Sequence, residues 1–271
     1  MNRKPKEIQN KPILSTVLKH PPVSFSLKIC YTVFMKYSAI FEQSYHQICA
    51  LPDFPREKTG QLWEALPRCS RWIVAFLYLL PFGEEPGKDE ITYGKVLTLL
   101  TLSSLVHDDL TKERAFSSKE AVLYGDYFFA LAFSLLPDSV TEKDGQRIAG
   151  RACRYSEKRL EHQKTPPVTA EESLQFAKTD YGTVLMDIAK EAMEKNHFNK
   201  EHTEQYGRCA EKLGTIWGLL CENNVSLCAP LLEEVKADIT GLPMEAGLND
   251  LRNELEGATL ENKAQHRTAK K

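Results

Sequence analysis

The 271-residue sequence has no excess of charge of either sign. Its 35 lysines and arginines nearly balance its 37 aspartates and glutamates, which gives a formal net charge of −2. A chain with balanced charge has no long-range electric field that would attract nucleic acid or an anionic membrane surface. A nucleic-acid-binding protein is therefore not expected.

Long hydrophobic runs are also missing. The longest apolar stretches, residues 72–82 and 96–106, are much shorter than the roughly 20 residues that a membrane-spanning helix needs. The N-terminal segment is basic and is not followed by the apolar core of a signal peptide. These features predict a cytoplasmic protein whose residues 1–24 form a flexible basic arm.

Paired cysteine motifs are absent as well. None of the seven cysteines belongs to a C-x-x-C pair, which is the usual spacing of zinc and redox sites. Most of them fall within apolar helical patterns, so we expect reduced, buried thiols. They are residues 30, 49, 69, 153, 209, 221 and 228.

Signals for β-strands are missing, whereas signals for helices extend over most of the chain. No alternating apolar pattern is bounded by Asn-Gly or Asp-Gly turns. Apolar residues instead recur at steps of three and four, and capping boxes are expected at Ser117 with Glu120 and at Thr169 with Glu172. This pattern predicts helices over residues 27–51, 58–66, 68–80, 89–109, 117–136, 139–163, 169–195, 200–222, 231–239 and 244–256.

We therefore predict an all-α fold in which about nine or ten helices form a single-domain bundle. Short linkers and a uniform composition argue against a division into two domains. The predicted domain covers residues 25–258, and residues 259–271 are expected to form a polar tail.

Two segments contain candidate functional residues. Asp108 and Asp109 follow His107 at the end of a leucine-rich helix, and adjacent carboxylates are costly to bury unless a cation or a solvated cavity compensates. The alternative is a helix end at the surface with both acids solvated. The second segment, residues 121–132, is almost wholly apolar but contains Asp126 beside Gly125. A charged side chain buried in such a segment needs a partner, and glycine permits a neighbouring helix to approach closely.

Together these segments resemble the trans-type polyprenyl diphosphate synthases, in which HDD is followed by AVLAGDY. The matching strings here are His107-Asp108-Asp109 and residues 121–127, AVLYGDY. The resemblance implies an isoprenoid-synthase-like bundle with a cavity between helices, where an allylic diphosphate is joined to isopentenyl diphosphate. It also implies several Mg²⁺ ions, because carboxylate-bridged cations neutralise the departing diphosphate.

The first metal motif implied by the resemblance is incomplete. Asp108 and Asp109 match its first two aspartates, but Lys112 occupies the position of the third, one helical turn above Asp108. Lysine places a cation where a ligand for Mg²⁺ belongs. The arginine pair that follows the motif in the family is reduced to Arg114.

The second metal motif has lost more of its ligands. It aligns with residues 214–225, where Cys221 and Glu222 replace the expected aspartate pair and Val225 replaces the later aspartate. One carboxylate of three remains. The resemblance therefore implies a retained scaffold with eroded metal sites.

The resemblance also assigns substrate contacts. The family's cations for isopentenyl diphosphate align with Arg68 and Arg71. The residues that limit product length when they are bulky align with Ser103 and Ser104, whose small side chains imply an open product cavity, although two serines could simply allow close helix packing. The charged run at residues 157–164 is interpreted as a solvated helix face, while an inward Arg159 would be able to touch diphosphate.

This pattern favours an accessory or regulatory subunit of a heterodimeric long-chain prenyl diphosphate synthase, most like the small component of heptaprenyl diphosphate synthase. Such a chain has no catalytic residues of its own. The implied partner is a catalytic subunit that carries both aspartate motifs and binds most of the Mg²⁺. The implied ligands of the enzyme are prenyl diphosphates. Its product becomes the side chain of menaquinone.

Three alternatives remain open. The chain could be a complete but divergent synthase that uses Asp108, Asp109, Glu113 and Glu222. It could be an HD-type metal-dependent phosphohydrolase, in which His107 and Asp108 bind a metal ion with help from His46 and Asp126. It could also be a plain helical interaction protein.

Overall fold

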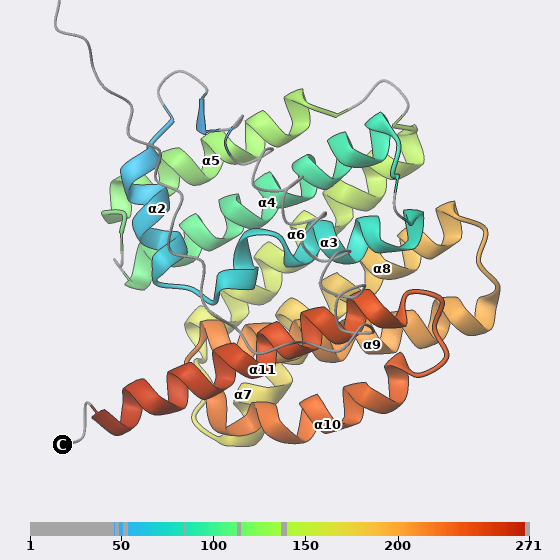
Figure 1. Ribbon diagram of the computed structural model, residues 1–271. Coiled ribbons are helices and arrows are strands. Elements are labelled where there is room, and N and C mark those ends of the chain that lie inside the picture. Colours follow the sequence, from blue (N-terminus) through green and yellow to red (C-terminus); the bar gives the residue numbers. More distant parts are fainter. Residues whose placement is uncertain are drawn as a thin grey trace, which may run out of the picture.

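The computed structural model describes residues 46, 49–50, 54–83, 85–112, 115–136 and 140–268. All regular secondary structure in this part of the chain is helical, which confirms the predicted all-α class (Figure 1). The predicted arm at residues 1–24 lies outside the described residues, and so does nearly all of the helix predicted over 27–51. None of the described helices is both long and apolar enough to cross a membrane.

The helices agree with the predicted ones in order and approximate position. They are α2 (Arg56–Glu64), the 3₁₀ turn η1 (Arg68–Arg71), α3 (Ile73–Leu79), the 3₁₀ turn η2 (Leu80–Phe82), α4 (Lys88–Lys112), α5 (Ser118–Ser134), α6 (Glu142–Lys164), α7 (Ala170–Ala177), the π-helical turn η3 (Lys178–Gly182), α8 (Thr183–Lys195), α9 (Lys200–Cys221), the 3₁₀ turn η4 (Val225–Leu227), α10 (Cys228–Ile239) and α11 (Glu245–Thr268).

Both predicted capping boxes are confirmed. The backbone N–H and hydroxyl of Ser117 donate to the Glu120 carboxylate at 3.1 and 2.7 Å, ahead of α5. Ahead of α7, the Thr169 N–H donates to Glu172 at 2.9 Å, and the Glu172 N–H donates to the Thr169 hydroxyl at 3.1 Å. These bonds satisfy N–H groups that have no partner within the helix.

Several helix boundaries differ from the prediction by about three residues, and one differs by more. α6 begins at Glu142, after a capping box formed by Thr141 and Asp144, and not at residue 139. α11 runs to Thr268, whereas the sequence pattern predicted its end at Glu256, so the helix crosses the expected start of the polar tail. Thr259 in this extension is buried, which shows that the continued helix still packs on the body.

α3 and α9 supply much of the core. All residues of α3 are buried, as the apolar segment 68–80 predicted, and α9 is buried along most of its length. The Tyr206 hydroxyl on α9 donates to the Leu77 carbonyl on α3 at 2.7 Å. The Trp217 indole N–H donates to the Ser70 hydroxyl at 2.8 Å. The buried polar ends of these aromatic rings are therefore satisfied within the core.

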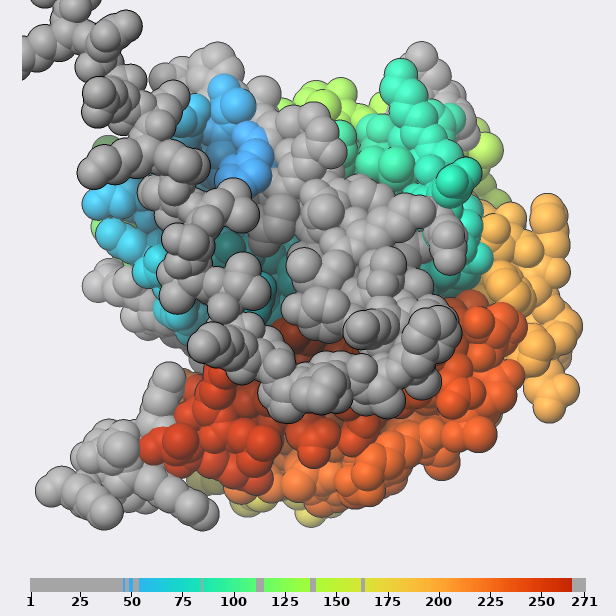
Figure 2. Space-filling model, in the orientation of Figure 1, coloured from blue at the N-terminus to red at the C-terminus, as the bar shows by residue number. Residues whose placement is uncertain are grey.

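α3 packs against α4 and α8, while α9 packs against α7, α8, α10 and α11. α4 and α5 lie side by side at the top of Figure 1, while α10 and α11 lie at the bottom. In the space-filling view, α10 and α11 form the lower surface in orange and red (Figure 2). Most described cysteines are buried, as expected, but Cys153 on α6 is exposed.

Candidate functional site

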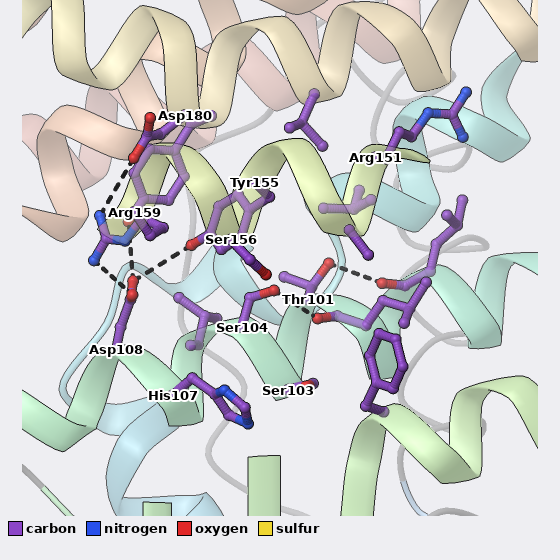
Figure 3. Close-up of a pocket in the computed structure, with 18 of the residues that line it drawn as sticks. Thr101, Ser103, Ser104, His107, Asp108, Arg151, Tyr155, Ser156, Arg159 and Asp180 are labelled. Atoms are coloured by element: carbon purple, nitrogen blue, oxygen red, sulfur yellow. Dashed lines mark hydrogen bonds and ion pairs between the residues drawn. The ribbon is translucent and has the colours of Figure 1, made fainter. Parts of the chain in front are cut away.

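A cavity of about 520 Å³ opens between α4, α5, α6, η3 and α8. Its walls are mainly apolar and include Leu97, Leu100, Val184, Leu185 and Ile188. Polar side chains gather at one end, where Asp108, Arg159 and Asp180 face one another (Figure 3). Apolar walls with a few convergent polar groups are typical of a small-molecule site.

Arg159 reaches from α6 into this polar end, and its side chain is only 12% exposed. One guanidinium nitrogen lies 2.6 Å from Asp108, while another lies 3.7 Å from Asp180 and 3.6 Å from Glu222. The three carboxylates come from α4, from η3 and from the end of α9. The interpretation of residues 157–164 as a solvated face is therefore wrong for Arg159, which joins three elements inside the molecule.

Aromatic rings complete the surroundings of this guanidinium. It lies 5.1 Å from the ring centre of Phe176 and 6.0 Å from that of Tyr181, within the range of cation–π contacts. Burial disfavours the charged form, but electrostatic interactions with Tyr155 and the Asp108 carboxylate outweigh this effect and raise the pKa of Arg159. The guanidinium is therefore a permanent buried cation.

Two tyrosines also face Asp108. The hydroxyls of Tyr155 and Tyr181 each donate to its carboxylate over 3.5 Å, and that of Tyr181 also donates to Glu222 over 3.4 Å. Burial raises the pKa of both tyrosines well above the ordinary value. They consequently remain neutral hydrogen-bond donors at this end of the cavity.

The π-helical turn η3 places Asp180 and Tyr181 at the cavity. It interrupts the helix predicted over residues 169–195 and approaches α9 closely at two glycines. A Cβ at Gly218 would lie 2.5 Å from the Tyr181 ring, and one at Gly214 would lie 2.9 Å from the Tyr181 carbonyl oxygen. Tyr181 then packs edge-on against Trp217, with ring centres 5.1 Å apart. Helical periodicity alone did not reveal this turn, so Asp180 could not be chosen from the sequence pattern.

The two aspartates predicted as metal ligands, Asp108 and Asp109, lie in different surroundings. Asp108 faces the cavity, whereas Asp109 is fully buried and is not among the residues that line the cavity. Asp109 accepts hydrogen bonds from the backbone N–H groups of Ala115 and Phe116 at 2.8 and 2.7 Å. These bonds fix the chain between α4 and α5, which gives Asp109 a role in the fold.

The strings that carry the family resemblance meet where α4 packs on α5. The His107 ring lies over Gly125, where a Cβ would be only 1.5 Å from it, and His107 Nε2 is 3.4 Å from Asp126. The Ser103 hydroxyl donates to the Gly125 carbonyl at 2.8 Å. Ser103 and Ser104 both lie in the cavity wall. The close packing of α4 on α5 thus explains why residue 125 is a glycine.

Arg68 and Arg71 lie elsewhere. Both belong to η1, which packs among α2, α3 and α11. Arg68 is exposed and Arg71 is half-buried, and neither occurs among the described residues that line the cavity. The structure does not bring these two cations together with Asp108.

The residues of the polar end do not fit a magnesium ion. Mg²⁺ requires several oxygen ligands in a nearly octahedral arrangement. Across the described ranges, no group of three or more His, Cys, Asp or Glu side chains is close enough to hold a metal ion. Arg159 stands between Asp108 and Glu222, the residues that the resemblance aligned with the two motifs, and backbone N–H groups donate to Asp109. The Lys112 side chain and residues 113–114 lie outside the described part.

The metal set of an HD-type phosphohydrolase is not assembled either. Such a site would unite His107 and Asp108 with His46 and Asp126. In the described residues, His107 contacts Asp126, while Asp108 contacts Arg159 and His46 is exposed. No metal-binding group includes them within this part of the chain.

No protein-family model and no curated protein matches the sequence. Solved structures do match. A decaprenyl diphosphate synthase from Rhodobacter capsulatus is 13% identical, with a TM-score of 0.61, 86% of this chain covered and 98% of that one. A geranyltransferase from Helicobacter pylori, complexed with magnesium and isoprenyl diphosphate, is 14% identical, with a TM-score of 0.56 and coverage of 88% and 100%. The geranyl diphosphate synthase small subunit from Antirrhinum majus is 16% identical, with a TM-score of 0.55 and coverage of 86% and 100%. The chain therefore has the all-α isoprenoid synthase fold.

Proposed function

We propose that this chain is the accessory, non-catalytic subunit of a cytoplasmic heterodimeric long-chain trans-prenyl diphosphate synthase. The enzyme would be of the heptaprenyl type and would supply the isoprenoid side chain of menaquinone. The partner subunit would carry both complete aspartate motifs and the Mg²⁺ that neutralises the departing diphosphate. The fold supports a prenyltransferase-like role, and the state of the cavity supports its non-catalytic form.

The observation that carries the proposal is the position of Arg159. Its guanidinium contacts Asp108 from the first motif and lies near Glu222 from the second. A guanidinium donates hydrogen bonds in a fixed plane, but it cannot bridge carboxylates to phosphate oxygens as a metal ion does. A site built in this way keeps the shape of the fold without gathering the divalent cations that ionisation of a prenyl diphosphate needs.

The exposed face of α5 supports the pairing with a second subunit. Val122, Leu123, Tyr127, Phe129 and Leu135 are each at least 36% exposed. Exposed apolar residues gathered on one helix often mark a protein–protein contact. This face, which we call the α5 surface, also includes Phe129 of the cavity wall. A catalytic subunit docked here would therefore lie beside the cavity.

The first test is an activity measurement on each component. The purified chain alone should not elongate farnesyl diphosphate with isopentenyl diphosphate and Mg²⁺. Addition of a catalytic subunit that carries both motifs should give long-chain product at a rate well above that of either component alone. Robust turnover by the lone chain would refute the proposal and favour the divergent synthase.

The second test concerns the contact itself. The double substitution Leu123→Glu and Phe129→Glu should abolish co-purification with the catalytic subunit, because charges would be buried in the interface. Leu260→Glu on α11 is a matched control, since Leu260 is also exposed but lies far along the chain from α5. Unchanged co-purification of the double variant would exclude the α5 surface as the contact.

A further inference from the structure

The cavity beside Arg159 has the properties of a ligand site that works without a metal ion. We propose that it binds an apolar chain with an uncharged hydroxyl head, of the prenyl alcohol class, in preference to a diphosphate. This inference concerns the same cavity as the proposed function and rests on it only in treating the site as non-catalytic.

The size and walls of the cavity suit a flexible apolar chain. Its volume of about 520 Å³ lies within the usual range of small-molecule sites. Leucine, isoleucine and valine side chains from α4 and α8 line it, together with Phe129 of α5 and Trp217 of α9. Transfer of a hydrocarbon chain from water to such walls is favourable in proportion to the apolar area buried.

The polar end offers both hydrogen-bond donors and acceptors. Within the described structure, Nε and Nη1 of Arg159 are buried and have no acceptor within hydrogen-bond distance. The carboxylates of Asp180 and Glu222 are 3.7 and 3.6 Å from Nη1, which is beyond hydrogen-bond distance. Buried N–H groups favour a ligand that supplies an acceptor. A hydroxyl accepts from the guanidinium and also donates to a carboxylate, so it matches both kinds of group.

A diphosphate matches this end poorly. It carries several negative charges and only accepts hydrogen bonds, yet here it would stand beside Asp108, Asp180 and Glu222. The guanidinium that could attract it is held at 2.6 Å by Asp108. Like charges in a desolvated site are strongly unfavourable. The acidic surroundings therefore select a neutral head group over an anionic one.

Hydroxyl side chains along α4 add polarity without positive charge. Thr101 and Ser104 donate to the carbonyls of Leu97 and Leu100 at 2.8 and 3.0 Å, and Ser103 donates to α5. Their donors are thus used within the protein, and their oxygens can still accept. None of these groups offers the N–H donors or positive charge that bind phosphate.

Calorimetry on the purified full chain tests the inference directly. Farnesol should bind at least tenfold more tightly than farnesyl diphosphate, and added Mg²⁺ should not reverse this order. Farnesol should also bind at least tenfold more tightly than farnesene, the corresponding hydrocarbon without a hydroxyl. Equal or tighter binding of farnesyl diphosphate, no binding of farnesol, or equal binding of farnesol and farnesene would each overturn the proposal.

Two variants locate the site. Ser104→Phe should fill the cavity and lower farnesol affinity at least tenfold, while Ser134→Phe on the exposed part of α5 should leave it unchanged. Thermal melting checks that both variants are folded. Unchanged affinity in folded Ser104→Phe would place farnesol elsewhere and refute the assignment. Failure of this binding would leave co-purification with the catalytic subunit unaffected, so the two proposals can fail separately.

Discussion

Arg151 and Arg159 are two buried arginines on α6, about two helical turns apart, and they occupy very different surroundings. Arg151 pairs with Glu191 on α8, and Lys195 lies 3.2 Å from Glu191 and 3.1 Å from Asp144. Two cations therefore face two carboxylates in close contact. The Arg151 cluster, formed by these four residues, is a balanced ion-pair network that holds α6 against α8.

The Arg159 cluster, formed by Arg159 with Asp108, Asp180 and Glu222, is built differently. One guanidinium faces three carboxylates, and only the contact with Asp108 is as short as a hydrogen bond. Both clusters are largely buried, but among the described residues the carboxylates outnumber the cation only in the second. The difference supports the proposal that Arg159, and not a divalent cation, occupies this end of the cavity.

Removal of Glu191 from the balanced cluster should have the largest effect. Glu191→Gln leaves the buried Arg151 and the partly buried Lys195 without the carboxylate that they share, and it weakens the hydrogen bond from the Tyr93 hydroxyl. The expected loss is about 3–5 kcal/mol in the free energy of unfolding, measured by urea denaturation. Glu194→Gln, which breaks a more exposed pair with Arg147, should cost less than about 1 kcal/mol. Equal losses would contradict the structural role assigned to the Arg151 cluster.

Substitution of the adjacent Asp108 and Asp109 should change the free energy of unfolding by different amounts. Asp109→Ala removes two buried hydrogen bonds to backbone N–H groups and should cost about 2–4 kcal/mol in urea denaturation. Asp108→Ala should cost about half as much, because Arg159 keeps Asp180 and Glu222 nearby. The reverse order would mean that Asp108, and not Asp109, is the residue that the fold needs.

Asp250 and Glu254 on α11 show how a neighbouring carboxylate changes the pKa of a half-buried acid. Burial and the charge of Glu254 raise the pKa of Asp250 to about 6. Since the folded state then favours the protonated form, the ionised carboxylate destabilises the fold fully above about pH 6, and this penalty fades as the pH falls from there to the ordinary aspartate pKa of 3.8. Asp250→Asn should therefore stabilise the protein by about 1 kcal/mol at pH 7.5 and by almost nothing at pH 4. A stabilisation that does not vary with pH would contradict this explanation.

The sequence predicted most of the fold because helix signals are local. Three- and four-residue spacing and the boxes at Ser117 and Thr169 depend on neighbouring residues, and the structure confirms them. The predicted end of α11 at Glu256 was wrong because tertiary packing extends the helix beyond its apolar pattern. The π-turn at Asp180 depends on the contact with Gly214 and Gly218 of α9, which no local pattern reveals.

The candidate site could be predicted only in part. Asp108 was recognised from its motif and lies in the cavity, but Asp109 beside it carried the same signal and is held by backbone groups. The charged run around Arg159 looked like a solvated face. The step from Ile148 through Ala152 and Tyr155 continues to Arg159 on the same side of α6, and all four line the cavity. This spacing was the available signal for an inward arginine.

The most direct test of the account is the response of Arg159→Gln to Mg²⁺ in thermal unfolding. Removal of the guanidinium leaves three carboxylates facing one another, so the variant should melt below the wild type and should regain several degrees when Mg²⁺ is added. The wild type, and Arg154→Gln at a more exposed pair with Asp187, should not respond. Equal stabilisation of the wild type by Mg²⁺, or no response in Arg159→Gln, would contradict the proposal that Arg159 keeps divalent cations out of this end of the cavity.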